Sequence, residues 1–422
     1  MKIAVFGPGP IFKGGIANYT LSLAKEFDKR EGIEVDIVSW TQQYPSIIPR
    51  DFINRSIKTD PLEGTKINVT YVTNFNNPFS WHKTADAINN IKPDILIVQW
   101  AIAIQGLPIN TILKRVKERT NCEIIFILHV VKQKEESIID NFLLKLALRN
   151  ADSYLVHAEK YFEELKLVFP EQKFFIDSSG KRALSDDEKT VIKLYHPVYD
   201  MFSPDPHFNK NKFKEELGLR KNVFLFFGFI RKYKGLHNVI RAFAKLAAER
   251  DDVSLLIVGE SFWNTLDTKS FATKLKKGLF GTIKKLVLKR KEDEADYRPL
   301  DLIKELNLVD KVVTVNNYVP NEDVHKYFQA ADCNVLFYLV ATPSGVESTA
   351  YNFSVPSIAS RIGHFSESIE EGYNGYLAEP NDLNSMYLAM KKFVEHPIPK
   401  KNVAETAKNY SWRNYVNIIL NK

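Results

Sequence analysis

The stretch that decides the fold runs from Lys2 to Phe27 and reads KIAVFGPGPIFKGGIANYTLSLAKEF. Its first residues form an apolar strand that ends in a glycine, and a glycine-rich loop follows. Apolar side chains then recur at helical spacing, at Ile16, Tyr19, Leu23 and Phe27. A buried strand, a glycine loop and an amphipathic helix in this order are typical of a doubly wound α/β domain.

The same alternation of strand and helix continues along the whole chain. Strand-like runs span residues 2–6, 35–40, 67–72, 95–99, 123–129, 153–157, 223–229, 254–259, 311–316, 334–339, 356–360 and 375–378. Most of these runs are apolar on both faces, as strands of a parallel sheet covered by helices are. The fold class that we predict is therefore α/β, with parallel sheets.

The length of the chain calls for more than one core. Its 422 residues fit two domains of about 200 residues each. A proline-rich and polar stretch from His196 to Pro206 breaks both periodicities and marks the boundary. We therefore expect two Rossmann-like domains, at 1–200 and 201–403, with a C-terminal helix at 404–422 that packs back on the first domain.

The net charge of +7 is concentrated in one place. Eight Lys and Arg residues lie between Lys274 and Lys291 with no acidic residue among them, and without them the chain is close to neutral. This distribution indicates a local basic patch and argues against a nucleic-acid-binding surface. The patch lies in an expected insertion at about 262–297, where apolar residues at helical spacing suit the surface of an anionic membrane. A solvated helix or a flexible loop is the alternative.

The remaining composition predicts a cytoplasmic protein. The longest apolar runs, such as 123–131 and 223–230, fall short of the roughly 18 residues of a membrane-spanning helix. We expect no signal peptide, because the N-terminal apolar run is short and leads into a glycine turn. Cys122 and Cys333 are far apart in strand-like runs and are expected to be free thiols, and no His/Cys cluster has the spacing of a metal site.

Three loops at strand ends could bind an anion. Gly14 and Gly15 precede the first helix and would expose backbone N–H groups, although a loop that only needs glycine dihedrals is an equal alternative. Arg231 and Lys234 follow a strongly apolar strand and could neutralise a diphosphate. A third loop, Pro343-Ser344-Gly345, joins a strand to a helix. Ligands of open α/β sheets bind beyond the carboxyl ends of the strands, which favours function at these loops.

Together these motifs resemble a known family. The chain is similar over nearly its full length to the GT-B glycosyltransferases of the large retaining family that includes sucrose synthase. The resemblance depends on the order and spacing of five motifs. They are Gly14-Gly15-Ile16, the strand ending in His129, Phe227-Gly228 with Lys234-Gly235, Phe328-Gln329-Ala330-Ala331-Asp332, and the series Gly363, Glu367, Gly372 and Gly375.

The resemblance implies a role for several residues. Gly15 would offer its N–H to the donor diphosphate across the cleft between the domains. His129 would orient the reacting sugar as the catalytic residue; without the resemblance, a buried core histidine would be the preferred interpretation. Lys234 matches the family lysine on the diphosphate, and Arg231 replaces the usual arginine, since Phe229 occupies that position. The amides of Ser344, Gly345 and Val346 would meet the sugar and phosphate.

The sequence departs from the family at a pair of glutamates eight positions apart. Ala341 and Thr349 stand at those positions, and Glu347 lies two residues early. The residue that holds the nucleotide ribose is therefore Thr349, Ser348 or Glu347. A subset of bacterial members has a similar loop, so the change alone does not imply inactivity.

The function that the resemblance implies is retaining transfer of a sugar from a nucleotide-diphosphate donor, without metal or cofactor. The acceptor would be a glycan or a lipid-linked molecule in the assembly of a surface polysaccharide or glycolipid. Residues 274–291 would bring the enzyme to the inner face of the membrane. A non-catalytic GT-B subunit that binds a sugar or a partner is the alternative from another class, and an epimerase of the same fold is the alternative among enzymes.

Overall fold

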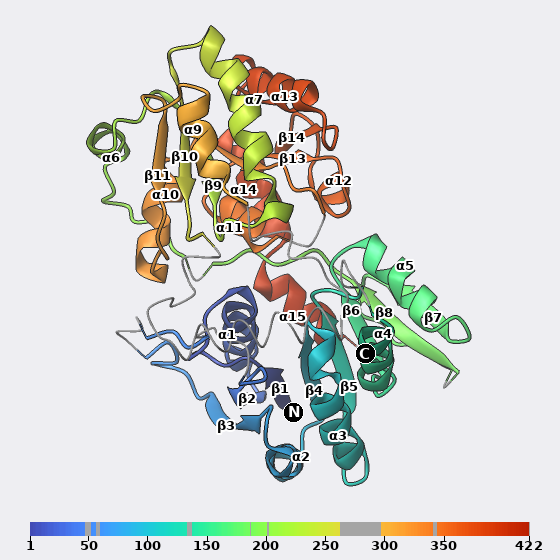
Figure 1. Ribbon diagram of the computed structural model, residues 1–422. Coiled ribbons are helices and arrows are strands. Elements are labelled where there is room, and N and C mark those ends of the chain that lie inside the picture. Colours follow the sequence, from blue (N-terminus) through green and yellow to red (C-terminus); the bar gives the residue numbers. More distant parts are fainter. Residues whose placement is uncertain are drawn as a thin grey trace. The chain divides into compact units, whose positions relative to one another are not determined.

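The computed structural model describes residues 1–46, 52–55, 60–132, 137–185, 187–200, 202–261, 297–340 and 344–421. These residues form two compact units, each built on one parallel sheet (Figure 1). Unit 1 holds the described residues of Met1–Tyr195 and Trp412–Lys422. Unit 2 holds those of His196–Leu266 and Lys291–Ser411. The predicted fold class is confirmed.

Unit 1 contains an eight-stranded sheet in the order β3-β2-β1-β4-β5-β6-β8-β7. The strands are β1 (Lys2–Gly7), β2 (Glu34–Gln42), β3 (Asn68–Asn74), β4 (Ile95–Trp100), β5 (Glu123–Leu128), β6 (Ser153–Val156), β7 (Lys173–Asp177) and β8 (Glu188–Lys193). The helices are α1 (Gly15–Asp28), α2 (Pro78–Ile91), η1 (Ala103–Gln105), α3 (Gly106–Lys117), α4 (Ile138–Leu148), α5 (Glu159–Val168) and α15 (Trp412–Leu420). Neighbouring strands pair in parallel throughout, so their carboxyl ends share one edge.

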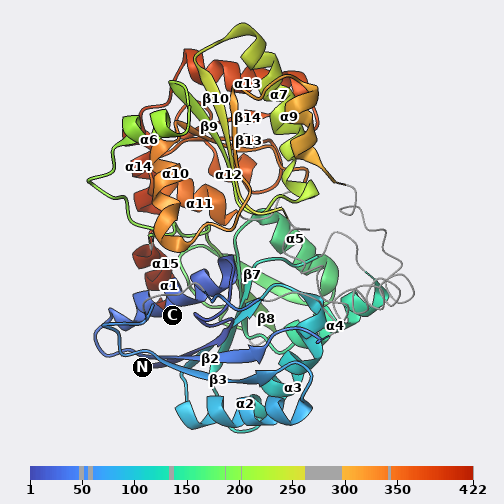
Figure 2. The same ribbon diagram turned by 60° about the vertical axis from the view of Figure 1, so that its left-hand side comes forward.

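Unit 2 contains a six-stranded sheet in the order β11-β10-β9-β12-β13-β14. The strands are β9 (Asn222–Phe227), β10 (Val253–Val258), β11 (Val312–Val315), β12 (Cys333–Leu336), β13 (Ser357–Ser360) and β14 (Gly375–Ala378). The helices are α6 (Lys210–Glu216), η2 (Lys232–Lys234), α7 (Leu236–Glu249), η3 (Pro299–Asp301), α9 (Leu302–Glu305), η4 (Asn321–Asp323), α10 (Val324–Ala330), α11 (Gly345–Asn352), α12 (Phe365–Ser368), α13 (Leu383–Glu395) and α14 (Lys400–Asn409). Helix α7 packs on α13, and α11 packs on α14 (Figure 2).

All twelve predicted strands are present, and two further strands were missed. Strands β7 and β8 carry charged residues at both ends, and β7 is an edge strand that leaves most of its side chains partly exposed. Their short apolar centres do not stand out from the polar segments around them. Edge strands of this kind give the weakest sequence signal.

The expected C-terminal helix at 404–422 is two helices. Helix α14 ends at Asn409 and belongs to unit 2, whereas α15 begins at Trp412 and belongs to unit 1, where it contacts α1. The carbonyl of Tyr410 accepts a hydrogen bond from the N–H of Val198. This bond takes the Tyr410 carbonyl out of the helical ladder and separates the two helices.

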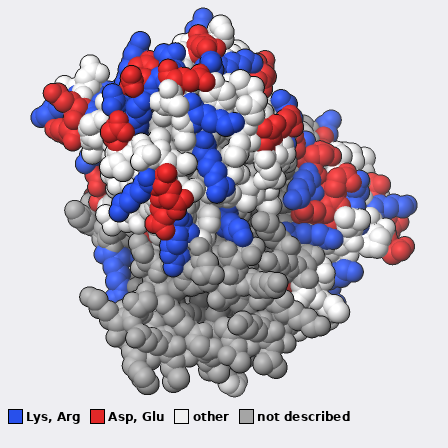
Figure 3. Space-filling view, turned by 45° about the horizontal axis from the view of Figure 1, so that its top comes forward, with Lys and Arg blue, Asp and Glu red and all other residues white. Residues whose placement is uncertain are grey.

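The basic segment 274–291, and all of the expected insertion except Tyr297, lie outside the described residues. Where the surface is described in Figure 3, Lys and Arg side chains alternate with Asp and Glu side chains. Charged side chains of opposite sign are therefore neighbours over the part of the face that is described.

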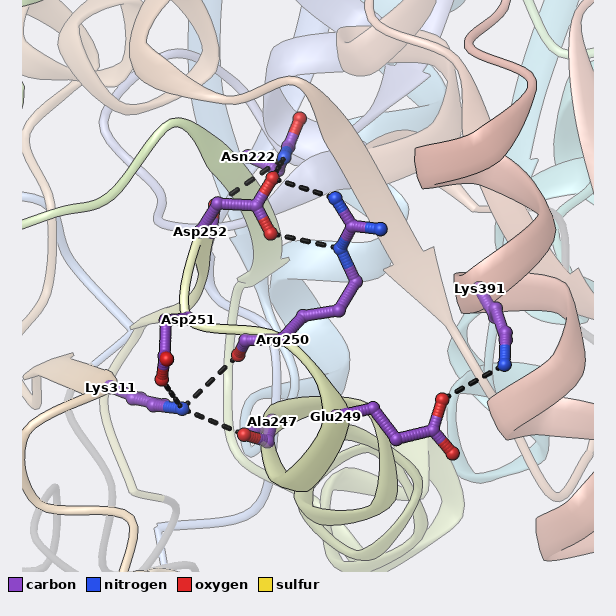
Figure 4. A network of polar contacts seen from close by, with 8 residues as sticks. All are labelled: Asn222, Ala247, Glu249, Arg250, Asp251, Asp252, Lys311 and Lys391. Carbon is purple, nitrogen blue, oxygen red and sulfur yellow. Dashed lines mark hydrogen bonds and ion pairs between the residues drawn. The ribbon is translucent and has the colours of Figure 1, made fainter.

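The amino edge of the unit 2 sheet is fastened by a polar network (Figure 4). Lys311 donates to the carbonyls of Ala247 and Arg250, at 2.7 and 3.1 Å, and to Asp251 at 2.8 Å. Arg250 in turn forms a bidentate pair with Asp252, with both contacts at 2.8 Å. One lysine thus satisfies carbonyls at the end of α7 and joins that helix to the start of β11.

We expect Lys311→Met to lower the free energy of unfolding by about 1–2 kcal/mol, because two helix-end carbonyls lose their donor. Chemical denaturation of the full chain measures this change. Asp251→Asn is the matched control and should have little effect, since the Asp251 side chain is 93% exposed. Equal effects of the two variants would contradict the role given to the carbonyls.

Candidate functional site

The predicted anion-binding residues of unit 2 meet at the carboxyl edge of its sheet. The loop after β9 carries Gly228 and Lys234, and the loop after β12 leads to the start of α11. Gly228 has a φ of +95°, and a Cβ built there would lie 2.8 Å from Lys234 Nζ and 3.6 Å from Val346 Cγ2. The ammonium of Lys234 therefore lies against Gly228, close to the first turn of α11. A side chain at position 228 would occupy this space.

Lys234 is a buried cation that has no counter-charge among the described residues. The residue is 8% exposed, and within the described ranges no acceptor or carboxylate contacts its ammonium. Burial lowers the pKa of Lys234 to about 8, and the nearby charge of Arg231 acts in the same direction. A charge buried in this way is costly unless an anion joins it. The predicted pair of cations is thus brought together by the fold.

The start of α11 adds backbone donors to the same place. Gly345 is the first residue of the helix, and Ser344 is its N-cap without a side-chain capping bond. Tyr338 links this helix end to the cation, because its ring lies 5.9 Å from Lys234 Nζ and its hydroxyl lies 3.3 Å from Ser344 Oγ. A Cβ at Gly345 would stand 2.6 Å from Tyr199, so only glycine fits there. Helix N–H groups beside a buried lysine suit a phosphate.

Glu347 lies inside the protein, where three side chains hold its carboxylate. Ser368 and Tyr351 donate to Oε1 at 2.6 and 3.2 Å, and His364 Nε2 lies 3.1 Å from Oε2. Glu347 is 4% exposed. These contacts join α11 to the segment that follows β13. The predicted contact of Glu347 with a donor stays a prediction.

Ser348 and Thr349 also face inward, and each is 4% exposed. The Thr349 hydroxyl donates to the Gly345 carbonyl at 2.7 Å, and the Ser348 hydroxyl lies 3.0 Å from His196 Nδ1. Burial lowers the pKa of His196 to about 4, so this imidazole is neutral at physiological pH. Ala341, the other departure from the glutamate pair, lies outside the described residues.

Sequence reasoning missed the partners of these residues. His196, Tyr338 and the pair His364 and Ser368 come from three different segments, and their contacts with α11 depend on tertiary packing. The only signal was the position of His364, directly after Gly363 in a loop at a strand end. That position indicates nearness to the carboxyl edge but not the partner.

The other predicted residues lie in unit 1. Gly15 begins α1, and Gly14 is its N-cap with a φ of +109°, a conformation that favours glycine. His129 follows β5, and its Nε2 lies 2.7 Å from Gln99 Oε1 on β4. The ring of Tyr19 from α1 stands edge-on to His129, with centroids 4.8 Å apart. These residues and the cations of unit 2 belong to different units.

Comparison with known proteins finds similarity to glycosyltransferases. A family model described as "Glycosyl transferases group 1" matches residues 207–410. The lipopolysaccharide 1,2-N-acetylglucosaminetransferase of Salmonella typhimurium is 24% identical over 312 residues, which is 68% of this chain and 71% of that protein. Spore coat protein SA of Bacillus subtilis is 23% identical over 230 residues, about half of each chain (53%).

Solved structures agree on the fold. HepE of Anabaena, solved in complex with UDP-glucose, has a TM-score of 0.65 at 16% identity. The alignment covers 100% of this chain and 97% of HepE. A glycosyltransferase from Rickettsia africae has a TM-score of 0.65 at 15% identity, with 99% of its length covered. Residues 207–410 are therefore similar to the glycosyl transferases group 1 family, and the two α/β units have the GT-B fold.

Proposed function

We propose that this protein transfers a sugar from a nucleotide-diphosphate donor, and that Lys234, Arg231 and the first amides of α11 hold the diphosphate. The buried ammonium of Lys234, which no carboxylate in the described part of the chain contacts, carries this proposal. The match of residues 207–410 to the group 1 glycosyltransferase model supports it, as does the similar fold of HepE, which was solved with UDP-glucose. A diphosphate would bind here better than a neutral ligand, because its negative charge would pair with the desolvated ammonium of Lys234.

In the proposed reaction the bond between the anomeric carbon and the diphosphate oxygen breaks. The acceptor hydroxyl oxygen bonds to that carbon, and its proton leaves to the departing diphosphate or to solvent. Negative charge grows on the leaving oxygen, where preorganised cations and amides stabilise it. These groups supply the positive charge, so we propose that neither a metal nor a cofactor is needed. Retention of configuration stays a prediction.

We propose a glycan or lipid-linked acceptor in surface polysaccharide or glycolipid assembly. The similarity to the Salmonella lipopolysaccharide N-acetylglucosaminetransferase supports this class of acceptor. Calorimetry with a panel of nucleoside diphosphates and their sugars, in the presence of EDTA, tests the proposal. We expect selective binding of one base, and Lys234→Met should weaken that binding about 10–100-fold, since a charge-assisted contact is lost.

Lys311→Met is the matched control for this experiment, because it removes a lysine at the opposite edge of the same sheet. It should leave nucleotide affinity unchanged. If the wild-type chain binds nothing in the panel, the non-catalytic subunit becomes the better interpretation. If Lys234→Met binds as tightly as the wild type, the diphosphate lies elsewhere.

The affinity for the diphosphate should depend on pH. The pKa of Lys234 is about 8 in the free protein, so the ammonium is present below this pH and is lost above it. Binding of an anion requires the charged form. Affinity for UDP should therefore be nearly constant between about pH 7 and 8, where the terminal phosphate is fully ionised, and fall up to about tenfold per pH unit above pH 8, as isothermal titrations would measure. Lys234→Met should remove this dependence.

We also propose peripheral association with an anionic membrane. Residues 274–291, which we expect to contact the membrane, lie outside the described residues. Helix α4 offers a second surface for such a contact. A capping box of Ser137 and Asp140 fixes the start of α4, where Ile138 is 90% exposed and Phe142 is 62% exposed. Lys145 is exposed on the same helix. Apolar anchors beside a cation suit the interface of an anionic bilayer.

No helix among the described residues is long and apolar enough to cross a membrane. The form of association that we test is peripheral contact. Sedimentation with phosphatidylglycerol–phosphatidylcholine vesicles, against phosphatidylcholine alone, measures it.

Phe142→Ser should weaken binding to the anionic vesicles about tenfold, because one aromatic anchor is lost. Deletion of 274–291 should weaken it further through lost charge. Leu388→Ser, at a half-exposed leucine on α13, is the matched control and should bind as the wild type does. Unchanged binding of both test variants would exclude the proposal.

A further inference from the structure

One face of the unit 1 sheet carries an unusual pair of polar side chains. Parallel register pairs Gln99 of β4 with Ile127 of β5, so these two side chains lie on the same face. His129 is two residues beyond Ile127, and since side chains alternate between the two faces along a strand, its side chain lies on that same face. The opposite face holds the large apolar cluster that includes Trp100 and Leu128. Gln99 therefore lies on the face opposite that apolar cluster, close to Gly7 and His129.

Of the two polar atoms of the Gln99 side chain, one has a hydrogen-bond partner and the other has none among the described residues. Its Oε1 lies 2.7 Å from His129 Nε2. Its Nε2 is buried and contacts no acceptor in the described ranges, and the residue is only 4% exposed. An unmet amide donor in such a place costs about 1–3 kcal/mol. A buried glutamine kept at this cost calls for an explanation other than packing.

The backbone of the neighbouring strand makes room for this glutamine. A Cβ built on Gly7 would stand 2.6 Å from Gln99 Cγ and 2.9 Å from its Cβ. Tyr19 of α1 covers the imidazole of His129 edge-on. The side chains of Gln99 and His129 are thus enclosed between the end of β1 and α1, in a fixed relation to each other.

We propose that Gln99 is a positioning residue that keeps a proton on the Nε2 of His129. An amide oxygen only accepts hydrogen bonds, so the Nε2 of His129 must carry the proton. In the neutral ring Nδ1 then keeps its lone pair and acts as an acceptor. The tautomer does not depend on the proposed function.

The tautomer can be measured directly on the full chain. Two-dimensional NMR of protein labelled with ¹⁵N in its histidines reports which ring nitrogen carries the proton, and His129→Gln identifies the signals of His129. The wild type should show separate, unaveraged shifts of an Nε2-protonated neutral ring at neutral pH. Gln99→Met keeps the volume but removes the acceptor, so the shifts should move toward the average of two exchanging tautomers.

Two further variants separate positioning from packing. In Gln99→Glu the carboxylate favours the protonated imidazole, so His129 should stay cationic to higher pH than in the wild type. Gly7→Ala should reproduce the spectrum of Gln99→Met, because its methyl displaces Gln99. Gln105→Met is the matched control: Gln105 is another buried glutamine of unit 1, and it donates to the carbonyl of Gln43 instead. It should leave the His129 signals unchanged.

The result separates this proposal from the proposed function. Binding of UDP is measured in the Gln99 and Gln105 variants, and we expect the wild-type value because Lys234 lies in the other unit. A wild-type ring protonated at Nδ1, or shifts that do not change in Gln99→Met, would overturn the role of Gln99. A chain that binds no nucleotide but shows the expected shifts would overturn only the sugar-transfer function.

Discussion

A single ammonium, buried without a negative partner among the residues that the structure describes, is the constraint on which unit 2 depends. Lys234 occupies space that exists only because position 228 is a glycine at positive φ. Tyr338 lies between this cation and the N-cap of α11. The loop after β9 and the helix after β12 are therefore shaped around one charge. Parallel strands bring these two segments to the same edge without any requirement on their separation in sequence.

The two edges of the same sheet handle charge in opposite ways. At the amino edge Lys311 and Arg250 both have carboxylate partners and fasten the end of α7. At the carboxyl edge the cation is desolvated instead of paired. Paired charges stabilise a fold only modestly and bind nothing further. A desolvated one is costly to the free protein and gives an anion a strong partner, which is the arrangement expected where a ligand completes the structure.

How far the sequence predicts this molecule depends on how local each feature is. The strands, the loops at their ends and the cations at Arg231 and Lys234 follow from short patterns in the sequence, and the structure contains them. The edge strand β7 escaped because its apolar centre is short and flanked by charge. The contacts of Glu347 with His364 and Ser368 escaped because they join segments 17 and 21 residues away. The pairing of Gln99 with His129 likewise requires the sheet order, which places β4 beside β5.

The energetics of Lys234 show why such a group would be kept. Its pKa is about 8 in the folded protein, against 10.5 for an ordinary solvated lysine, and the difference corresponds to roughly 3 kcal/mol. Because the folded-state pKa is the lower one, the charged form opposes folding in full below pH 8, and the penalty fades between pH 8 and 10.5. An anion that pairs with the ammonium removes that penalty, and the free energy recovered in this way strengthens the binding of the anion. Gln99 in the other unit is comparable, because its amide nitrogen has no acceptor among the described residues while its amide oxygen contacts His129. In both candidate sites, stability is given up at the place where a ligand or a defined protonation state is gained.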